Sequence, residues 1–179
     1  MKDALKINHG NDEFFTPEYA VYPLLKYIPG DVKTIWCPCD TEDSKIVQVL
    51  QNSGYKVYCS HIDYGHDFLK YDLLHSEYDM IITNPPFSIK NKIIKRCYDL
   101  RKPFALLLPL TGLEGQARCE MYDKKGIGVV ILDKRVEFGS GNVWFNTSWF
   151  IHSKMTDGRL FFEHIDKFEK EQKGQLTLF

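Results

Sequence analysis

The sequence predicts a single α/β domain with a mostly parallel sheet. Strand-like and helix-like segments alternate along its 179 residues, which is typical of sheets whose parallel strands are joined by helices. The chain is 44% hydrophobic and 26% charged, which suits one globular core and excludes a disordered protein. Its formal net charge of −1 excludes strong electrostatic binding of nucleic acid by the chain as a whole, because affinity for nucleic acid increases with the number of phosphates neutralised. An activity on nucleic acid therefore requires a local basic patch or a tether.

Three strands and one helix are expected in the first half of the domain. The run Thr34–Cys37 is apolar and ends at Pro38, so we expect it to be the first strand. The segment 44–52 carries apolar residues at helical spacing and is followed by Gly54, a common helix stop. Two further apolar runs are expected to be strands: 55–60 and 79–83.

The second half is expected to alternate in the same way. One helix is expected at 89–100, ending before Pro103, and another at 113–125, which Gly126 ends. Strands are expected at 104–108, 129–132 and 148–152, with a glycine-containing turn at 139–142. We expect one domain over 1–165, followed by a charged arm over 166–179.

The chain shows neither a secretion signal nor a membrane span. Residues 1–11 are polar and no apolar run approaches bilayer length, so we expect a cytoplasmic protein without membrane contact. Its five cysteines are then expected to be free thiols. Four possible zinc ligands match no common spacing, and no metal is expected at them: Cys37, Cys39, Cys59 and His61.

The tetrapeptide Asn84-Pro85-Pro86-Phe87 follows the strand expected at 79–83. It therefore lies at the carboxyl end of a parallel strand, where open α/β sheets build ligand sites. The two prolines fix two φ angles and remove two N–H donors, so the carbonyls of Asn84 and Pro85 are held in a rigid turn. Asn84 Oδ1 and the Pro85 carbonyl can each accept one N–H of an exocyclic amine, and Phe87 can stack on its ring, a contact worth roughly 1–3 kcal/mol for a nucleobase. An ordinary turn with a core phenylalanine is the alternative.

On this motif the chain resembles the adenine-N6 methyltransferases that use S-adenosylmethionine, in particular the small enzymes carried by phages and prophages. The resemblance runs from about Asp12 to Phe162. It implies a Rossmann-like class I methyltransferase fold, with a mostly parallel seven-stranded sheet, an antiparallel last strand and helices on both faces. It also implies S-adenosylmethionine as the methyl donor, DNA as a partner, and a catalytic role for Asn84, Pro85, Pro86 and Phe87.

The resemblance further assigns residues to the cofactor. A segment ahead of the first strand is implied to lie against the cofactor, the first strand-to-helix turn to bind its methionine portion, and an Asp-Phe-Leu segment to contact its adenine. The residues assigned in this way are Phe15, Thr16, Pro17, Cys37, Pro38, Asp40, Asp67 and Phe68. Leu108-Pro109-Leu110 is implied to form another wall of the pocket.

Two departures from the family pattern leave alternatives open. The first strand-to-helix turn contains no glycine, a residue that relatives use to bring the backbone close to the cofactor. Asp40, Glu42 or Asp43 can hold the ammonium group of the cofactor there, or can simply favour the start of the following helix. After the second strand, relatives place an acid for the ribose hydroxyls. Asp63 is favoured here over His61, which can donate or accept only singly.

A basic segment follows the tetrapeptide directly. Its cations are expected to meet nucleic-acid phosphates, with a solvated amphipathic helix as the alternative: Lys90, Lys92, Lys95 and Arg96. Lys134 and Arg135 can extend this patch. Four side chains near the last two expected strands can frame a base flipped out of the duplex, although some of them belong to the core: Trp144, Phe145, Asn146 and Trp149.

The last five residues, Gln-Leu-Thr-Leu-Phe, resemble the motif that binds the bacterial sliding clamp. The resemblance assigns clamp contacts to Gln175, Leu176, Leu178 and Phe179. A few apolar anchors carry most of such binding, and a tether raises the local concentration at DNA without a new DNA contact. A tail that packs on its own domain is the alternative.

Together these features predict an enzyme that methylates N6 of adenine in DNA while tethered to the replication clamp. Adenine in RNA is an alternative substrate. A glutamine amide is a weaker one, because glutamine methylators usually carry tyrosine at the position of Phe87. The glycine-free turn also leaves open a catalytically silent module that binds the clamp or DNA. The oligomeric state is not predicted.

Overall fold

A computed structural model describes residues 15–138 and 145–166, and these form one seven-stranded sheet. The strand order is β2-β1-β3-β4-β6-β5-β7. The strands are β1 (Thr34–Cys37), β2 (Lys56–Cys59), β3 (Met80–Thr83), β4 (Phe104–Pro109), β5 (Gly128–Leu132), β6 (Thr147–His152) and β7 (Leu160–Glu163). All neighbouring pairs are parallel except the two that β6 makes, with β4 and with β5. The mostly parallel, seven-stranded Rossmann-like sheet expected from the sequence is confirmed.

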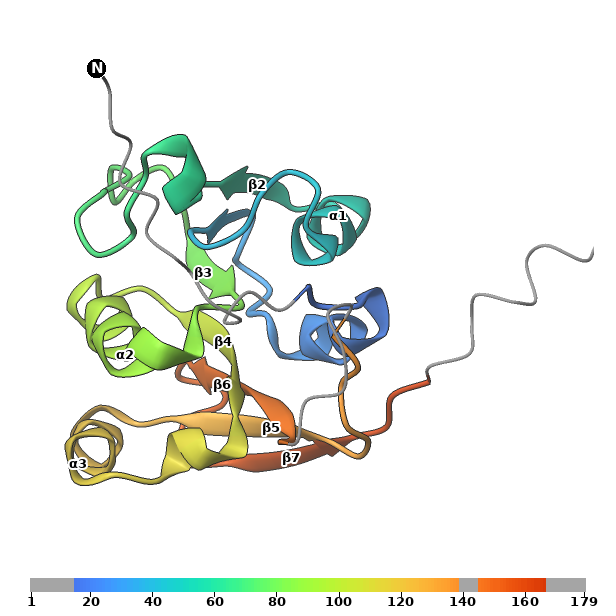
Figure 1. The fold of residues 1–179 in the computed structure, drawn as a ribbon, viewed down its shortest axis with the longest axis vertical. Coiled ribbons are helices and arrows are strands. Elements are labelled where there is room, and N and C mark those ends of the chain that lie inside the picture. Colours follow the sequence, from blue (N-terminus) through green and yellow to red (C-terminus); the bar gives the residue numbers. More distant parts are fainter. Residues whose placement is uncertain (1–14, 139–144, 167–179) are drawn as a thin grey trace, which may run out of the picture.

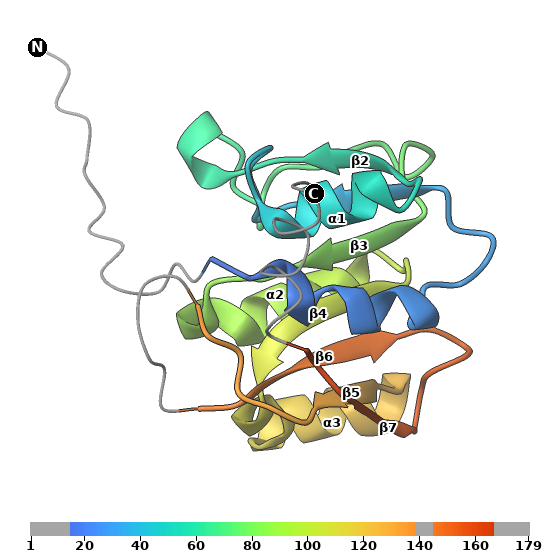
Figure 2. The same cartoon turned by 90° about the vertical axis from the view of Figure 1, so that its right-hand side faces the viewer.

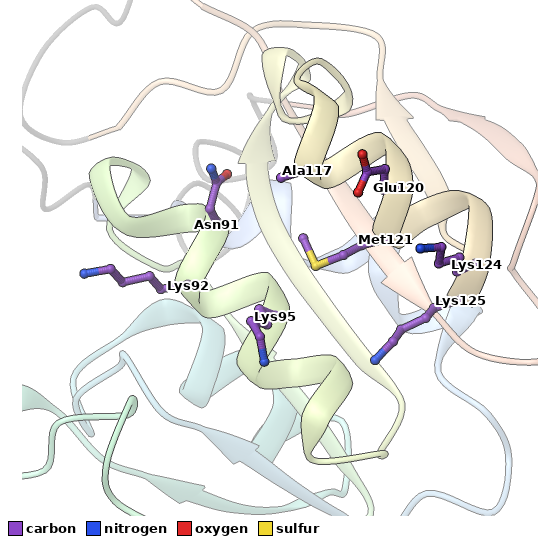
Figure 3. A pocket seen from close by; sticks show the side chains of 8 residues that line it. All are labelled: Asn91, Lys92, Lys95, Ala117, Glu120, Met121, Lys124 and Lys125. Carbon is purple, nitrogen blue, oxygen red and sulfur yellow. The ribbon is translucent and has the colours of Figure 1, made fainter.

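Helices cover both faces of the sheet (Figures 1 and 2). On one face lie α1 (Lys45–Asn52) and the 3₁₀ segments η1 (Glu18–Ala20) and η2 (Tyr22–Tyr27). On the other face lie α2 (Lys90–Asp99) and α3 (Gln116–Lys125). Two apolar clusters, one on each side of the sheet, fill the space beneath these helices. The three α-helices lie within the segments 44–52, 89–100 and 113–125, where the sequence analysis expects helices. α2 and α3 lie side by side and leave a groove between them (Figure 3).

The last strand differs from the expectation. The antiparallel strand is β6, and a further strand, β7, follows it and pairs parallel with β5. The sequence pattern does not reveal β7 because it is a four-residue edge strand whose apolar side chains are partly solvent-facing: Leu160 is 60% exposed and Phe162 is 74% exposed. Edge strands of this kind are defined by the neighbour with which they pair more than by their own composition.

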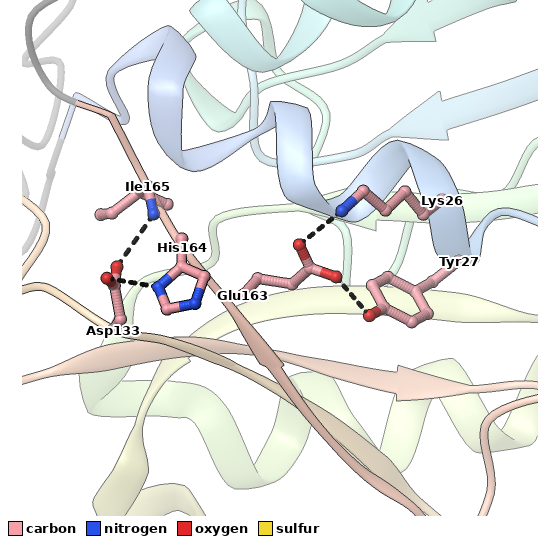
Figure 4. A network of polar contacts seen from close by, with 6 residues as sticks. All are labelled: Lys26, Tyr27, Asp133, Glu163, His164 and Ile165. Atoms are coloured by element: carbon pink, nitrogen blue, oxygen red, sulfur yellow. Dashed lines mark hydrogen bonds and ion pairs between the residues drawn. The ribbon is translucent and has the colours of Figure 1, made fainter.

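A set of polar contacts fastens β7 and the residues after it to the domain (Figure 4). Glu163 accepts hydrogen bonds from Lys26 Nζ at 2.7 Å and from Tyr27 Oη at 2.6 Å, both on η2. Burial and the hydrogen bond to the Glu163 carboxylate raise the pKa of Tyr27 to about 12. Asp133, after β5, contacts His164 Nδ1 at 2.9 Å and accepts from the backbone N–H of Ile165 at 2.9 Å. The chain is therefore held to the sheet as far as Ile165.

Several expected features lie outside the described residues. They include the turn at 139–142, Trp144, and nearly all of the arm expected at 166–179. The four clamp-contact positions, Gln175, Leu176, Leu178 and Phe179, are among them. Within the described residues, no helix has the length and apolar character that crossing a membrane requires.

Candidate functional site

The candidate site lies at the carboxyl ends of β1 and β3, in the middle of the sheet. The chain passes from β1 to β2 on one side and then to β3 on the other side of β1. Such a reversal of strand order opens a crevice at the carboxyl ends, and open α/β sheets place ligands there. Asn84 follows β3 directly and Pro38 follows β1 directly. The fold therefore brings the tetrapeptide and the first strand-to-helix turn to one point, as the sequence analysis expects.

The Asn84 side chain is oriented by a residue from far away in the sequence. Its Nδ2 donates to Thr16 Oγ1 at 3.0 Å, and Thr16 is only 6% exposed. This bond places Nδ2 against Thr16, so Oδ1 is the opposite end of the amide, and that oxygen is buried in this conformation. Phe15, Thr16 and Pro17 were assigned to the cofactor, and the structure places Thr16 against the tetrapeptide itself.

The rest of the tetrapeptide forms a turn that leads into α2. Pro85 is buried, and Pro86 begins the short 3₁₀ segment η4 (Phe87–Ile89). Phe87 is 8% exposed, and its ring meets Phe145 edge to face at 5.5 Å between centroids. Phe87 is thus a core residue in this conformation. Phe145, one of the four side chains proposed to frame a base, is its neighbour.

A buried carboxylate joins the two strand ends. Asp40 Oδ2 accepts from Thr83 Oγ1 at 2.5 Å, and its Oδ1 accepts from Ser44 Oγ at 2.7 Å. The backbone N–H of Asn84 also hydrogen-bonds Asp40. Thr83 Oγ1 in turn accepts from the backbone N–H of Cys39 at 3.2 Å. Burial raises the pKa of the Asp40 carboxyl, against the lowering effect of the hydrogen bonds from Thr83, Ser44 and Asn84.

These contacts change the interpretation of the first turn. Cys37 is fully buried in the core and Pro38 is buried, so neither side chain is presented to a ligand. Asp40 is 7% exposed and both of its oxygens are engaged within the protein. Contacts of Cys37, Pro38 and Asp40 with the cofactor stay a prediction, and the structure places all three residues in the interior. Asp40 holds the turn against the tetrapeptide. Glu42 and Asp43 remain exposed and stay candidates for an ammonium group.

The two candidates for the ribose contact lie together after β2. Asp63 Oδ2 is 3.3 Å from His61 Nδ1, and the backbone N–H of Asp63 donates to the same nitrogen at 3.3 Å. The Asp63 side chain is 67% exposed, whereas that of His61 is 14% exposed. Asp63 is thus open to a ligand, with His61 supporting the short segment η3 (Ile62–Tyr64) that carries it.

The Asp-Phe-Leu segment is used mainly for packing. Phe68 is 4% exposed and meets Trp36 edge to face at 5.2 Å between centroids. Asp67 Oδ1 accepts from the backbone N–H of Leu69 at 3.0 Å, and its Oδ2 lies 3.3 Å from Lys70 Nζ. Asp67 therefore stabilises its own turn, and Phe68 supports the site from within the core.

The four cations expected to meet phosphates have different surroundings. Lys90 donates to the Phe87 carbonyl at 3.3 Å, and Arg96 binds the Phe68 carbonyl and Asp72. Lys95 is exposed and pairs with Asp99 at 2.5 Å. Lys92 is exposed and makes no hydrogen bond or ion pair with the part of the chain that the structure describes. Lys90 and Arg96 thus serve the fold, and Lys92 and Lys95 remain available to a ligand.

The sequence analysis missed two contributors to the site. Thr83 is a fully buried polar residue at the end of an otherwise apolar strand, and that position was the available signal. The contact between Thr16 and Asn84 had no signal, because nothing in the sequence pairs residues 68 positions apart. No group of three or more His, Cys, Asp or Glu side chains within the described ranges is arranged to hold a metal.

No family model matches the chain. No curated protein matches it either. Among solved structures, the chain is similar to the release-factor-specific protein-(glutamine-N5) methyltransferase of Alicyclobacillus acidocaldarius subsp. acidocaldarius, with 12% identity and a TM-score of 0.45. That alignment covers 76% of this chain and 91% of the other. A likeness this distant has no bearing on the activity of the chain.

Proposed function

We propose that the protein transfers a methyl group from S-adenosylmethionine to the N6 amino group of adenine in DNA. The observation that carries this proposal is the placement of Asn84. It follows a central strand at the point where strand order reverses, and Thr16 accepts from its Nδ2, so Oδ1 is the end of the amide that can accept from a substrate. The rigid Pro85-Pro86 turn beside it adds the Pro85 backbone carbonyl as a second acceptor.

The catalytic role proposed for these two acceptors is to orient the adenine amino group. Asn84 Oδ1 and the Pro85 carbonyl accept the two hydrogens of the adenine amino group, which directs the nitrogen lone pair out of the ring plane. Bound S-adenosylmethionine supplies an electrophilic sulfonium methyl group. The two acceptors would hold N6 in line with that methyl group, so that the N6–carbon bond could form as the carbon–sulfur bond breaks, and the proton lost from N6 would pass to water. Holding two reactants in line can lower a barrier by about 7–11 kcal/mol, so no strong base is required.

The side chains around the crevice fit such a cofactor in chemical type. Glu42 and Asp43 are exposed acids at the start of α1, suited to an ammonium group. Asp63 is an exposed acid after β2, suited to a pair of ribose hydroxyls. Phe15 is 73% exposed beside Thr16 and offers an apolar surface. These residues would hold the cofactor, while Asp40 and Thr83 keep the two strand ends together.

Asn84→Ala tests the proposal. Wild-type protein is incubated with labelled S-adenosylmethionine and a mixture of DNA and RNA, and the nucleosides are analysed by mass spectrometry. We expect labelled N6-methyl-2′-deoxyadenosine, the nucleoside that comes from DNA. Asn84→Ala is expected to lose transfer by about 100-fold or more, since one of two orienting acceptors is gone, while its affinity for the cofactor changes little. Asn52→Ala, at the exposed end of α1, is the control and should retain full activity.

Other outcomes of this experiment separate the alternatives. Label in RNA adenine or in a protein glutamine would redirect the proposal to that substrate. Absence of cofactor binding in calorimetry at millimolar concentration would replace it with a silent binding module. Equal transfer by wild type and Asn84→Ala would remove the assigned role of Asn84.

We also propose that the C-terminal pentapeptide tethers the protein to a bacterial sliding clamp. Its support is the match of Gln175, Leu176, Leu178 and Phe179 to the clamp-binding pattern. The net charge of −1 makes a tether useful, because the domain as a whole lacks the positive charge that would hold it on DNA.

A further inference from the structure

The groove between α2 and α3 has a volume of about 410 Å³ and is lined by residues from both helices (Figure 3). Asn91, Lys92 and Lys95 come from α2; Ala117, Glu120, Met121, Lys124 and Lys125 come from α3. The Met121 side chain lies between the helices and points toward α2. Half of the lining residues are lysines, and they come from both walls.

The charge of this groove departs from that of the chain. The whole sequence balances 23 Lys and Arg residues against 24 Asp and Glu residues, whereas the groove lining holds four lysines and a single acid, Glu120. Lys95 is partly neutralised by Asp99, and Lys125 Nζ lies 5.2 Å from the centre of the Tyr98 ring. Lys92 and Lys124 are exposed and form no hydrogen bond or ion pair within residues 15–138 and 145–166. The groove and its rim therefore present net positive charge, with Lys92 at the rim, where its side chain points away from α3 (Figure 3).

The walls of the groove are held in place although α3 contributes little to the core. No residue of α3 is buried. Arg118 fastens the helix, because its Nε donates to the Gly112 carbonyl at 2.9 Å and its Nη1 donates to Asn91 Oδ1 on α2. Tyr122 Oη donates to the same Gly112 carbonyl at 3.1 Å. A polar helix kept on the surface by such contacts is available to bind a partner with its exposed side chains.

The groove begins close to the candidate active site. Asn91 lies four residues after Phe87 and is the lining residue closest to the tetrapeptide in the sequence. Both helices have ten residues and so run for about 15 Å. A nucleic-acid strand carries one phosphate per about 3.4 Å of helix axis, so a length of this order spans about four phosphates.

We propose that this groove binds the phosphate backbone of the nucleic-acid strand whose target base enters the Asn84 site. The inference rests on the proposed function, and it adds where the flanking nucleotides run: from the tetrapeptide along α2 and α3. Lys92 on one wall and Lys124 on the other contact phosphates. The Met121 floor and the lysine stems contact the sugars.

The test compares two double variants with the same change in net charge. Lys92→Gln/Lys124→Gln removes one cation from each wall of the groove. Lys33→Gln/Lys154→Gln removes two exposed lysines outside the groove, just before β1 and just after β6. The ligand is a fluorescent single-stranded oligonucleotide of about 12 nucleotides, a length that exceeds the groove. Its Kd is measured by anisotropy over a series of salt concentrations, with melting temperature as the check on folding.

The groove variant is expected to bind the oligonucleotide about 25-fold more weakly at about 0.1 M salt. The magnitude of its slope of log K against log salt is expected to be about 1.4 smaller, because each lost phosphate contact on a single strand reduces that slope by about 0.7. The control variant should lose less than about threefold. In methyl transfer to the same oligonucleotide, the groove variant should raise KM and leave kcat unchanged.

Equal loss of affinity in the two double variants, or no loss in either, would overturn the groove as a backbone site. This outcome is separable from failure of the proposed function. Binding is read without turnover, so a protein that binds the oligonucleotide through the groove but transfers no methyl group refutes the activity and leaves the groove supported. A protein that methylates normally with both lysines replaced refutes the groove and leaves the activity supported.

Discussion

Replacing Thr83 by valine removes the hydroxyl that joins the two central strand ends, while keeping the shape of the side chain. Thr83 is fully buried, donates to Asp40 at 2.5 Å and accepts from the backbone N–H of Cys39 at 3.2 Å. Thr83→Val leaves both partners in place without this contact. We expect the variant to be less stable, and the turn after β1 to be held less firmly against Asn84.

The size of the effect follows from these two bonds. Leaving a donor such as the partly buried Cys39 N–H without its acceptor costs up to about 1–3 kcal/mol, and a hydrogen bond to a charged group contributes about 1.5–3 kcal/mol. The methyl group that replaces the hydroxyl recovers about 1 kcal/mol by apolar burial. The expected loss in the free energy of unfolding is therefore about 1.5–5 kcal/mol. Because the Thr83 hydrogen bond lowers the pKa of Asp40, that pKa should rise further in the variant.

Thr147→Val is a matched control. Thr147 is also a strand residue and is 1% exposed, but its hydroxyl has no hydrogen-bond partner among residues 15–138 and 145–166. The same chemical change there should leave stability unchanged or raise it by up to about 1 kcal/mol. Urea unfolding at neutral pH measures both variants. A loss below about 0.5 kcal/mol for Thr83→Val, or an equal loss for Thr147→Val, would refute this reasoning.

Two further predictions concern acid stability and the C-terminal peptide. Asp79 Oδ2 accepts from the backbone N–H groups of Lys33 and Thr34 at 2.9 and 2.8 Å, and these bonds lower its pKa from 3.8. The ionised Asp79 carboxylate contributes fully to stability above its pKa in the unfolded state. This contribution is lost as pH falls through its lower pKa in the folded state. Asp79→Asn should therefore destabilise the protein at neutral pH. The difference in free energy of unfolding between variant and wild type should shrink below about pH 3.8, and urea unfolding at several pH values measures it. A difference that stays constant with pH would contradict this prediction. Deleting the five residues 175–179 should abolish capture on an immobilised bacterial sliding clamp and leave turnover on short oligonucleotides unchanged, and clamp capture by the truncated protein would disprove the tether.

The local pattern of apolar and capping residues was enough to predict most strands and helices of the domain. The apolar runs of β1, β3 and β4 are buried on both sides, and such strands are recognisable as continuous hydrophobic segments. Helix α1 has its apolar residues on one side and Ser44 as its N-cap, with the Ser44 Oγ accepting from the Ile46 N–H at 3.2 Å. β7 was not predicted, because its partner β5 lies about 30 residues earlier and none of its own four residues is buried.

The sequence by itself determined that a rigid Asn-Pro-Pro-Phe turn stands at the carboxyl end of a buried strand, because strand composition and proline geometry are local properties. Only the tertiary structure decided which polar groups face a ligand. Asp40 and Cys37 were candidates by position, yet folding turns Asp40 into a buried link to Thr83 and Cys37 into core. Thr16 and the lysines of α3 became relevant only when the chain brought them beside Asn84 and α2. The division has a physical cause: backbone conformation depends on neighbours in the chain, whereas burial and hydrogen-bond partners depend on residues that meet only in the folded state.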